Sequence, residues 1–589
     1  MSAQNRFVLA VVLMLAVLVG GNLLFPPAPA PEGEPPVADT TVEDPEVVVP
    51  QDTEAVAEAP GGPGVGGPSA GISDEPTDPD LPGLTPEAEA PEVVQEDVST
   101  SQLVTVESPL YRFTFSDVGA RVRSIELPGF DSFTRSGPVE LVGEESQGIL
   151  GHRLLPEAAA DTVELRSVRF QVTPAEGIVL EEGGEPQTLT FRYEHPTEPF
   201  AFEVAYTFHP DQYIVHARGR SEGLNRGLVI TDLGIGPAFN EADEARERTD
   251  LGYVVNHLQQ GIQSTSMSDV EGRTVVEGPL LWAATKSSYF TLGLFPREQA
   301  GDAAYLGGAL VQPAPEMEDR AAVSATQSLE SGGVFEYRFY GGPQDYQRLS
   351  ALGSEFQEVN PPGWRWMRPV LRPIVAGIMW VLTFFHTTLA IGYGWVLILV
   401  GILMRVVLFP LNHKAQRAQL RNMAVQPLLK EIQTKYKDQP EKLQKELMKL
   451  YKEHGFNPLA GCWPMLLPWP ILIALFFVFE NTIELRGVPF AWLPDLSAKD
   501  PVYVLPVLLA VSMFLMQWIS IRTIDDVNPQ MKMMMYIMPI MMLVIFANLP
   551  SGLNLYYLTA NLAMLPQSWW IARERQKMRA DGPPTTAKA

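Results

Sequence analysis

Hydrophobic residues follow two different patterns along the chain, and the first is an alternation. Between residues 101 and 355, apolar and polar residues alternate over short segments such as 111–115, 168–172 and 200–209, separated by Gly, Pro and Asp turns. Alternation at every second residue is typical of strands with one buried face, and regular turns connect such strands into antiparallel sheets. We therefore predict one large antiparallel β-sandwich for residues 101–355.

The second pattern is a series of continuous apolar runs after residue 389. At roughly 1.5 Å per helical residue, about twenty apolar residues span the hydrocarbon core of a bilayer. Five runs approach that length, at 392–411, 463–479, 502–521, 533–549 and 553–571. With an apolar run near the N-terminus, they predict six transmembrane helices. The predicted fold class is a multi-domain membrane protein, with a polytopic α-helical bundle and a large β-sandwich.

The first hundred residues contain an apolar run followed by an acidic stretch. Residues 7–25 are apolar and follow Arg6, which is typical of a signal peptide or of a signal anchor. Because Pro31 follows the Ala-x-Ala match at 28–30 and should hinder cleavage, we expect an uncleaved anchor at 1–25. Residues 26–100 hold sixteen prolines and eighteen carboxylates but no Lys or Arg, which predicts a disordered tether.

Two basic segments flank the run at 392–411. Arg365, Arg368 and Arg372 are three and four residues apart, which favours an amphipathic helix at 361–388 lying in the lipid headgroup region, with a plain linker as the alternative. Residues 412–461 hold ten Lys/Arg against five Asp/Glu, with apolar residues recurring every fourth position. This pattern predicts a helical hairpin, which the positive-inside rule places in the cytoplasm.

The charge distribution supports one topology and excludes several functions. Residues 1–360 carry a net charge of −36 and residues 361–589 a net charge of +10, which sum to −26. An acidic first half argues against nucleic acid as its partner. The single cysteine, Cys462, excludes an internal disulfide and any multi-cysteine metal site. With a cytoplasmic N-terminus, six spans place the sandwich outside the cytoplasm and the basic tail at 573–589 inside.

Arg405 is a charge within a bilayer-length apolar run. It lies six residues from residue 411, roughly 9 Å deep, where a charge costs on the order of 2.5–3.5 kcal/mol. No other predicted span carries Asp or Glu in its interior. One interpretation is that Arg405 snorkels to the nearer interface with only a structural role. The other is a wet, positively charged groove open towards one side of the membrane, which we favour.

Two further groups of residues in the predicted bundle have candidate roles beside Arg405. Asn554, Tyr557 and Asn561 fall on one helical face with Tyr556 beside them, and they either contact an unpaired arginine or join helices. Seven of the 21 methionines lie between 531 and 542, and flexible Met suits either adaptable binding of apolar partners or a packed core. The candidate apolar contacts are Met533, Met534, Met538, Met541 and Met542.

Four segments resemble the YidC/Oxa/Alb family of membrane protein insertases, in its Gram-negative form. They are the run at 395–411 with Arg405, and the segments 457–464, 490–501 and 549–557. The resemblance implies a groove that is open to the cytoplasm and the lipid but closed to the periplasm, in which the arginine receives hydrophilic parts of a nascent chain. Gly401 replaces the family's polar residue one turn before the arginine, so we expect that wall to be less polar.

The resemblance also implies the setting in which the chain acts. It implies an insertase and chaperone of the inner membrane rather than an enzyme, with an insertase core at 389–575, a periplasmic sandwich and both termini in the cytoplasm. It implies no cofactor, no metal and no direct DNA binding. The implied partners are nascent membrane proteins, the Sec translocon, the lipid bilayer, and the ribosome and signal-recognition receptor, with a contact through Arg573, Arg575, Lys577 and Arg579. The competing expectation is a channel or solute transporter with an accessory carbohydrate- or peptide-binding sandwich.

Overall fold

The computed structural model describes residues 101–157, 162–297, 304–315, 317–363, 366–436, 439–453, 469–522 and 529–580. The predicted anchor at 1–25 and the predicted tether at 26–100 lie outside these residues. Cys462, Arg365 and the first part of the predicted span 463–479 lie outside them as well.

The described part of the N-terminal half contains a smaller sheet of five strands in the order β4-β3-β2-β1-β8. Its neighbours are antiparallel except for β1 and β8, which run parallel. The strands are β1 (Leu103–Glu107), β2 (Arg112–Ser116), β3 (Arg121–Asp131), β4 (Pro138–Glu140) and β8 (Ile178–Val179).

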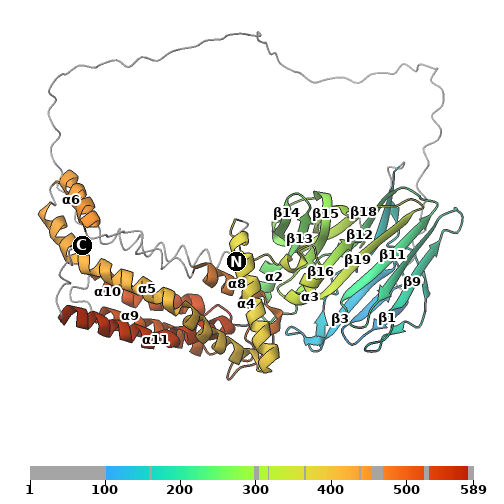
Figure 1. Ribbon diagram of the computed structural model, residues 1–589. Helices are drawn as coiled ribbons and strands as arrows, with labels where there is room; N and C mark the ends of the chain where they lie inside the picture. The colour runs from blue at the N-terminus through green and yellow to red at the C-terminus, as the bar shows by residue number, and fades with distance from the viewer. Residues whose placement is uncertain are drawn as a thin grey trace, which may run out of the picture. The chain divides into compact units, whose positions relative to one another are not determined.

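A larger sheet of fourteen described strands completes the domain (Figure 1). Twelve of them follow the order β6-β5-β12-β18-β17-β15-β16-β19-β11-β10-β9-β7, and β13 pairs with β14 and β15. The strands are β5 (His152–Pro156), β6 (Val163–Glu164), β7 (Gln171–Thr173), β9 (Gln187–Glu194), β10 (Ala201–Phe208), β11 (Ile214–Glu222), β12 (Gly227–Gly234), β13 (Gly252–His257), β14 (Gly261–Ser266), β15 (Thr274–Lys286), β16 (Phe290–Pro296), β17 (Leu306–Ala314), β18 (Met317–Ser328) and β19 (Val334–Pro343).

Aromatic side chains of the two sheets meet in one core. Phe113 of β2 packs against Phe208 of β10 with ring centroids 5.5 Å apart, and Phe115 packs against Tyr206 at 5.2 Å. All four rings are almost completely buried, so replacing Phe115 by Ala should cost about 3–5 kcal/mol. Strand β11 alternates buried and exposed residues from Val215 onward, as the sequence pattern predicts. The prediction of a β-sandwich is therefore confirmed.

The C-terminal half is helical (Figure 1). A second hydrophobic core, distinct from that of the sandwich, joins α4, α5, α8, α9 and α11. The helices are α4 (Arg368–Leu389), α5 (Tyr393–Lys435), α6 (Pro440–Glu453), α8 (Trp469–Asn481), α9 (Val504–Ile521), α10 (Pro529–Phe546) and α11 (Ser551–Ala580). Shorter helices are α2 (Glu244–Asp250), α3 (Tyr346–Ala351), η2 (Met267–Asp269), η3 (Phe356–Glu358) and η4 (Ile483–Leu485).

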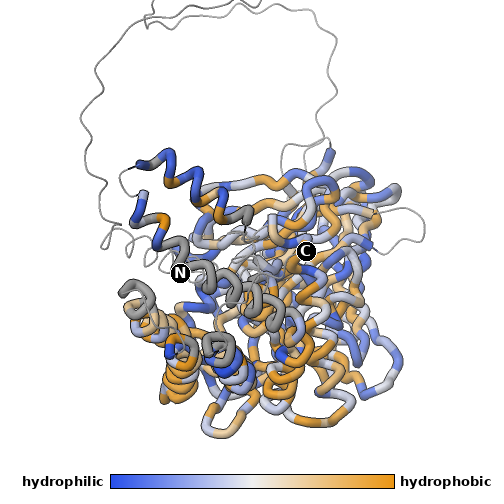
Figure 2. The backbone as a smooth tube through the Cα atoms, turned by 60° about the vertical axis from the view of Figure 1, so that its left-hand side comes forward, coloured by the Kyte–Doolittle hydropathy of each residue, from blue (hydrophilic) through white to orange (hydrophobic). Residues whose placement is uncertain are grey.

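Two described helical segments, Arg368–Leu389 and Tyr393–Pro410, are long and apolar enough to cross a membrane. Three shorter apolar helices lie at Pro470–Asn481, Val504–Ile519 and Met535–Phe546. Figure 2 shows long hydrophobic stretches in helical segments and shorter alternations elsewhere. Outward apolar residues such as Trp380, Val406 and Val544, each more than half exposed, suit contact with lipid. The count of six spans stays a prediction.

The predicted hairpin and the predicted headgroup helix can both be compared with the structure. Within the predicted hairpin at 412–461, the described residues form the end of α5, which continues without a break from Tyr393 to Lys435, and α6. The arginines expected to face lipid headgroups are also engaged otherwise. Arg368 donates to the backbone oxygen of Ile262 at 3.0 Å, and Arg372 pairs with Glu355 and Glu358. Carboxylates and carbonyls next to α4 therefore take up this basic face.

Candidate functional site

Arg405 lies on α5 against α11 and is partly buried. Its Nε donates one hydrogen bond of 3.0 Å to the backbone oxygen of Ala560. Within the described residues it forms no ion pair with a carboxylate. The guanidinium has five N–H donors, so most of its capacity is left for water or for another molecule.

Gly401 explains how Arg405 reaches across to α11. A Cβ added at Gly401 would lie 3.3 Å from the Cβ of Thr559 and 3.3 Å from the backbone oxygen of Tyr556, tighter than ordinary contact. The absence of a side chain therefore lets α5 and α11 approach closely one turn before Arg405. We expected Gly401 only to remove polarity from the wall, and the structure adds this packing role.

The two predicted tyrosines lie beside Arg405 and belong to the helical core. Tyr556 packs against Phe479 of α8 with centroids 5.9 Å apart, and Tyr557 packs against Phe546 of α10 at 5.3 Å. Both tyrosines are close enough to Arg405 to interact with its charge. The structure thus brings Arg405, Tyr556 and Tyr557 together, as the spacing predicts.

The two predicted asparagines contact neighbouring helices. The Nδ2 of Asn554 donates to the backbone oxygen of Phe546 at 2.9 Å, near the end of α10. The Nδ2 of Asn561 donates to the Oγ of Ser512 on α9 at 3.3 Å. These bonds correspond to the second of the two predicted roles for these residues, which is to join helices. Ser512 was missed by sequence reasoning, although a polar residue within the apolar run 502–521 is a visible signal.

Most of the described methionines of α10 are partly buried. Met533, Met538, Met541 and Met542 are partly buried, and the side chain of Met534 lies outside the described residues. Met535, which was not among the predicted contacts, is the buried one, with 6% exposure. Tyr536, Ile540 and Val544 of the same helix are exposed, so α10 presents an apolar face beside its methionines.

Of the predicted basic contact in the tail, Arg573 is described. It is exposed, and its guanidinium lies 3.8 Å from the ring centroid of Trp569, a cation–π geometry. The side chains of Arg575, Lys577 and Arg579 lie outside the described residues.

Comparison with known proteins decides the family. Residues 103–375 match the model of the YidC periplasmic domain, and residues 384–579 match the model of the 60Kd inner membrane protein. The membrane protein insertase YidC of Prosthecochloris aestuarii is 32% identical over 495 residues, which cover 80% of this chain and 82% of that protein. This chain belongs to the YidC family of membrane protein insertases.

Other YidC proteins give a similar match. The YidC of Chlorobium limicola is 30% identical over 80% of this chain and 82% of its own, and that of Maridesulfovibrio salexigens is 28% identical over 97% and 99%. The crystal structure of YidC from Thermotoga maritima aligns over 79% of this chain and 99% of its own, at 16% identity and a TM-score of 0.28. YidC proteins are insertases of the inner membrane rather than enzymes, so the transporter alternative is set aside.

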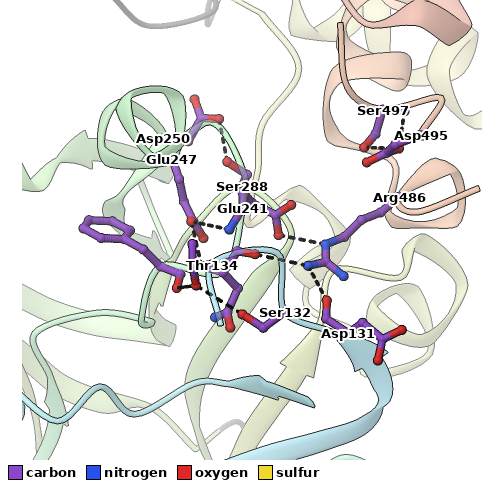
Figure 3. Close-up of polar contacts among 12 residues, drawn as sticks. Asp131, Ser132, Thr134, Glu241, Glu247, Asp250, Ser288, Arg486, Asp495 and Ser497 are labelled. Atoms are coloured by element: carbon purple, nitrogen blue, oxygen red, sulfur yellow. Dashed lines mark hydrogen bonds and ion pairs between the residues drawn. The ribbon is translucent and has the colours of Figure 1, made fainter. Parts of the chain in front are cut away.

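In this chain, an arginine of the helical region with a buried side chain contacts the periplasmic domain. Arg486, which follows η4, points into the domain in Figure 3 and has a side chain only 3% exposed. Its Nε donates to Glu241 Oε1 at 2.7 Å and its Nη2 to the backbone oxygen of Asp131 at 2.9 Å. Its guanidinium carbon lies 4.4 Å from the ring centroid of Phe133 and 5.3 Å from that of Phe290. Sequence reasoning missed this site.

A second carboxylate beside this contact has an altered acidity. Glu247 of α2 accepts from the backbone N–H groups of Asn240 and Glu241 at 2.8 and 2.9 Å. Burial, reinforced by the nearby charge of Glu241, raises the pKa of Glu247 to about 7. Glu247 is therefore partly protonated at neutral pH.

Proposed function

We propose that Arg405 receives the polar, preferentially acidic flank of a membrane-protein client while the client's apolar segment enters the bilayer. The observation that supports this is a partly buried guanidinium among apolar helices, with one backbone acceptor and no described carboxylate partner. An acidic flank would supply the missing acceptor, because charge-assisted hydrogen bonds are stronger than neutral ones. The groove around Arg405, open towards the cytoplasm, belongs to this proposal.

The client supplies the free energy in this mechanism. Burying apolar area contributes ~25 cal/mol per Å², so a spanning segment releases many kcal/mol without a nucleotide. The main barrier is the passage of the client's polar flank through the hydrocarbon core. A water-filled, positively charged groove would shorten the part of that path that lies in hydrocarbon. We propose that the exposed apolar face of α10, with Met533, Met538, Met541 and Met542, contacts the apolar segment, because flexible Met adapts to different partners.

The proposed topology has six spans, both termini in the cytoplasm and an insertase core at 389–575. The end of α5 and α6 together form the hairpin. The hairpin and the basic tail at 573–589 would then contact the ribosome and the signal-recognition receptor, and the bundle would contact the Sec translocon. The basic excess of these segments supports cytoplasmic placement through the positive-inside rule.

A charge-swap experiment tests the role of Arg405. Purified protein is reconstituted in liposomes without Sec components, and protease protection of a single-span client with an acidic, neutral or basic flank is measured. Wild type should insert the acidic-flank client best, and Arg405→Glu should reverse the preference towards the basic flank. Arg522→Ala serves as the matched control, because Arg522 is an exposed arginine of the same bundle that stacks on Trp518. Equal insertion of all three clients by wild type would contradict the proposal.

A further inference from the structure

A cavity of about 350 Å³ lies where the end of the periplasmic domain meets the helical region, and we call it the junction pocket. Its walls come from the segment around η3, from α4, from the end of α8 and from η4. The lining residues used below are Glu355, Glu358, Arg372, Met379, Phe477 and Glu484. Its volume lies in the range of small-molecule sites, which are commonly found at domain boundaries.

One carboxylate in the junction pocket has no described cation beside it. Arg372 binds two of the three lining glutamates, with Nη1 3.0 Å from Glu355 Oε1 and Nε 2.5 Å from Glu358 Oε1. Glu484 forms no ion pair within the described residues, and its buried Oε2 has no hydrogen-bond partner there. A buried acceptor left unsatisfied costs about 1–3 kcal/mol, and more when charged, so a donor group fits here.

The charged and titratable groups around Glu484 leave a net negative field. Asp345, before α3, acts on Glu484 and is 3.9 Å from Arg348. Glu355 and Glu358 share Arg372, and Tyr393 of α5 is close enough to interact with Glu484. Arg368 also acts on Glu358, so with Glu484 these groups comprise four carboxylates and three arginines. Burial, with the charge of Asp345, raises the pKa of Glu484 to about 7.

The remaining lining selects the kind of cation. The described residues contain no group of three or more His, Cys, Asp or Glu side chains arranged to hold a metal ion, which disfavours a metal. Met379 and Phe477 give the pocket an apolar wall that a hydrated metal ion would not use. A small organic cation fits both walls, because its charged end can meet a carboxylate while its carbon chain lies against the apolar side chains.

We propose that the junction pocket binds a primary ammonium group, which donates hydrogen bonds to Glu484 while the attached hydrocarbon packs against Met379 and Phe477. The ammonium group comes either from the ethanolamine head group of a phospholipid or from a free alkylamine. This site is separate from Arg405, and the proposal does not depend on the insertion mechanism.

Titration with n-butylammonium tests the pocket. The full chain, purified in detergent, is titrated at pH 8 while the thermal unfolding temperature and the heat of binding are recorded. Wild type should show saturable binding and Glu484→Gln at least a tenfold loss of affinity. Glu355→Gln is the matched control and should stay within about threefold of wild type, because Arg372 already neutralises Glu355. An equal loss in both variants would overturn the role of Glu484, as would absence of binding to wild type.

Two further measurements test whether binding needs ionised Glu484 and whether the ammonium group comes from a lipid or from a free amine. Because the ammonium needs ionised Glu484, lowering the pH from 8 to 6 through a pKa of about 7 should weaken binding about tenfold in wild type but not in Glu484→Gln. A pH-independent wild type contradicts the proposal. In nanodiscs, retention of phosphatidylethanolamine over phosphatidylcholine by wild type but not by Glu484→Gln supports the lipid source. Binding of butylammonium without lipid retention supports a free amine.

Discussion

Arg486 and Arg405 are two arginines of the helical region in opposite situations. The side chain of Arg486 is 3% exposed, donates to a carboxylate and a backbone carbonyl of the periplasmic domain, and lies against two aromatic rings. Arg405 is partly buried and has one backbone carbonyl as its hydrogen-bond partner within the described residues. Arg486 therefore has a carboxylate partner within the described residues, whereas Arg405 has none there.

The comparison distinguishes an arginine whose charge stabilises the fold from one whose charge is free to bind another molecule. Removing one partner of a buried ion pair leaves the other charge desolvated and uncompensated, so Arg486 should matter for stability. Removing an arginine that lacks a carboxylate partner leaves no orphaned anion and relieves a desolvation cost, so Arg405 should matter for activity instead. The predictions below test this separation, starting with the largest expected effect.

Arg486→Ala should destabilise the periplasmic domain by about 3–5 kcal/mol, because Glu241 loses its hydrogen-bonded cation while remaining buried. The thermal unfolding transition of the purified full chain measures this. The double variant Arg486→Met with Glu241→Leu should recover most of the loss, because it leaves no unpaired charge. An unfolding transition unchanged in Arg486→Ala would show that Arg486 does not stabilise the protein.

Glu247→Gln should remove a pH dependence of domain stability. The folded-state pKa of Glu247 is raised to about 7 from 4.5, so its stabilising protonation is present below pH 4.5 and lost as the pH rises towards 7. Linkage gives a loss on the order of 2 kcal/mol between pH 5 and pH 8. Gln retains the acceptor for both backbone N–H groups, so the variant should be more stable than wild type at pH 8. Identical profiles for the two proteins would count against a protonated Glu247.

Arg405→Ala should leave the unfolding temperature unchanged or slightly raised, while insertion of acidic-flank clients falls about tenfold, equivalent to about 1.4 kcal/mol. Arg405→Lys should retain most activity because it keeps the charge, and Arg405→Glu should be worst. Clients with neutral flanks should respond far less. Misfolding of Arg405→Ala, or a Lys variant as inactive as Glu, would make Arg405 a structural residue like Arg486.

Arg112→Ala should have the smallest effect. Arg112 pairs with Glu107 and Glu126 at 2.9 and 3.1 Å, but its side chain is 48% exposed. Exposed pairs typically contribute about 0–1 kcal/mol, so the unfolding temperature should move little, and less still in high salt. A loss as large as that of Arg486→Ala would show that burial does not explain the difference between the arginines.

Local periodicity was enough to predict the sandwich and to single out Arg405. The period of two in β11 corresponds to its buried and exposed faces, and a lone charge in an apolar run is visible without a structure. The contact of Arg486 was not predictable, because Glu241 lies 245 residues away in the sequence. The order of the larger sheet depends in part on pairings between strands distant in sequence, such as that of β11 with β19. The continuity of α5 across residues 411 and 412 was not predicted either, because the change there from apolar to polar residues does not tell whether a helix ends.

Because α5 continues without a break from Tyr393 to Lys435, a small tilt of this helix moves its far end by several ångströms. Its 43 residues correspond to roughly 65 Å at about 1.5 Å per residue. Its end at Lys435 lies thirty residues beyond Arg405, so a tilt of roughly 5° about the arginine displaces that end by roughly 4 Å. Pro410 lacks the N–H that would bond to the carbonyl of Val406, and Pro427 lacks the one that would bond to the carbonyl of Met423, so α5 loses a backbone hydrogen bond at two places. A force on the end of α5 can therefore bend the helix at two places, and the one at Pro410 lies just over one turn beyond Arg405.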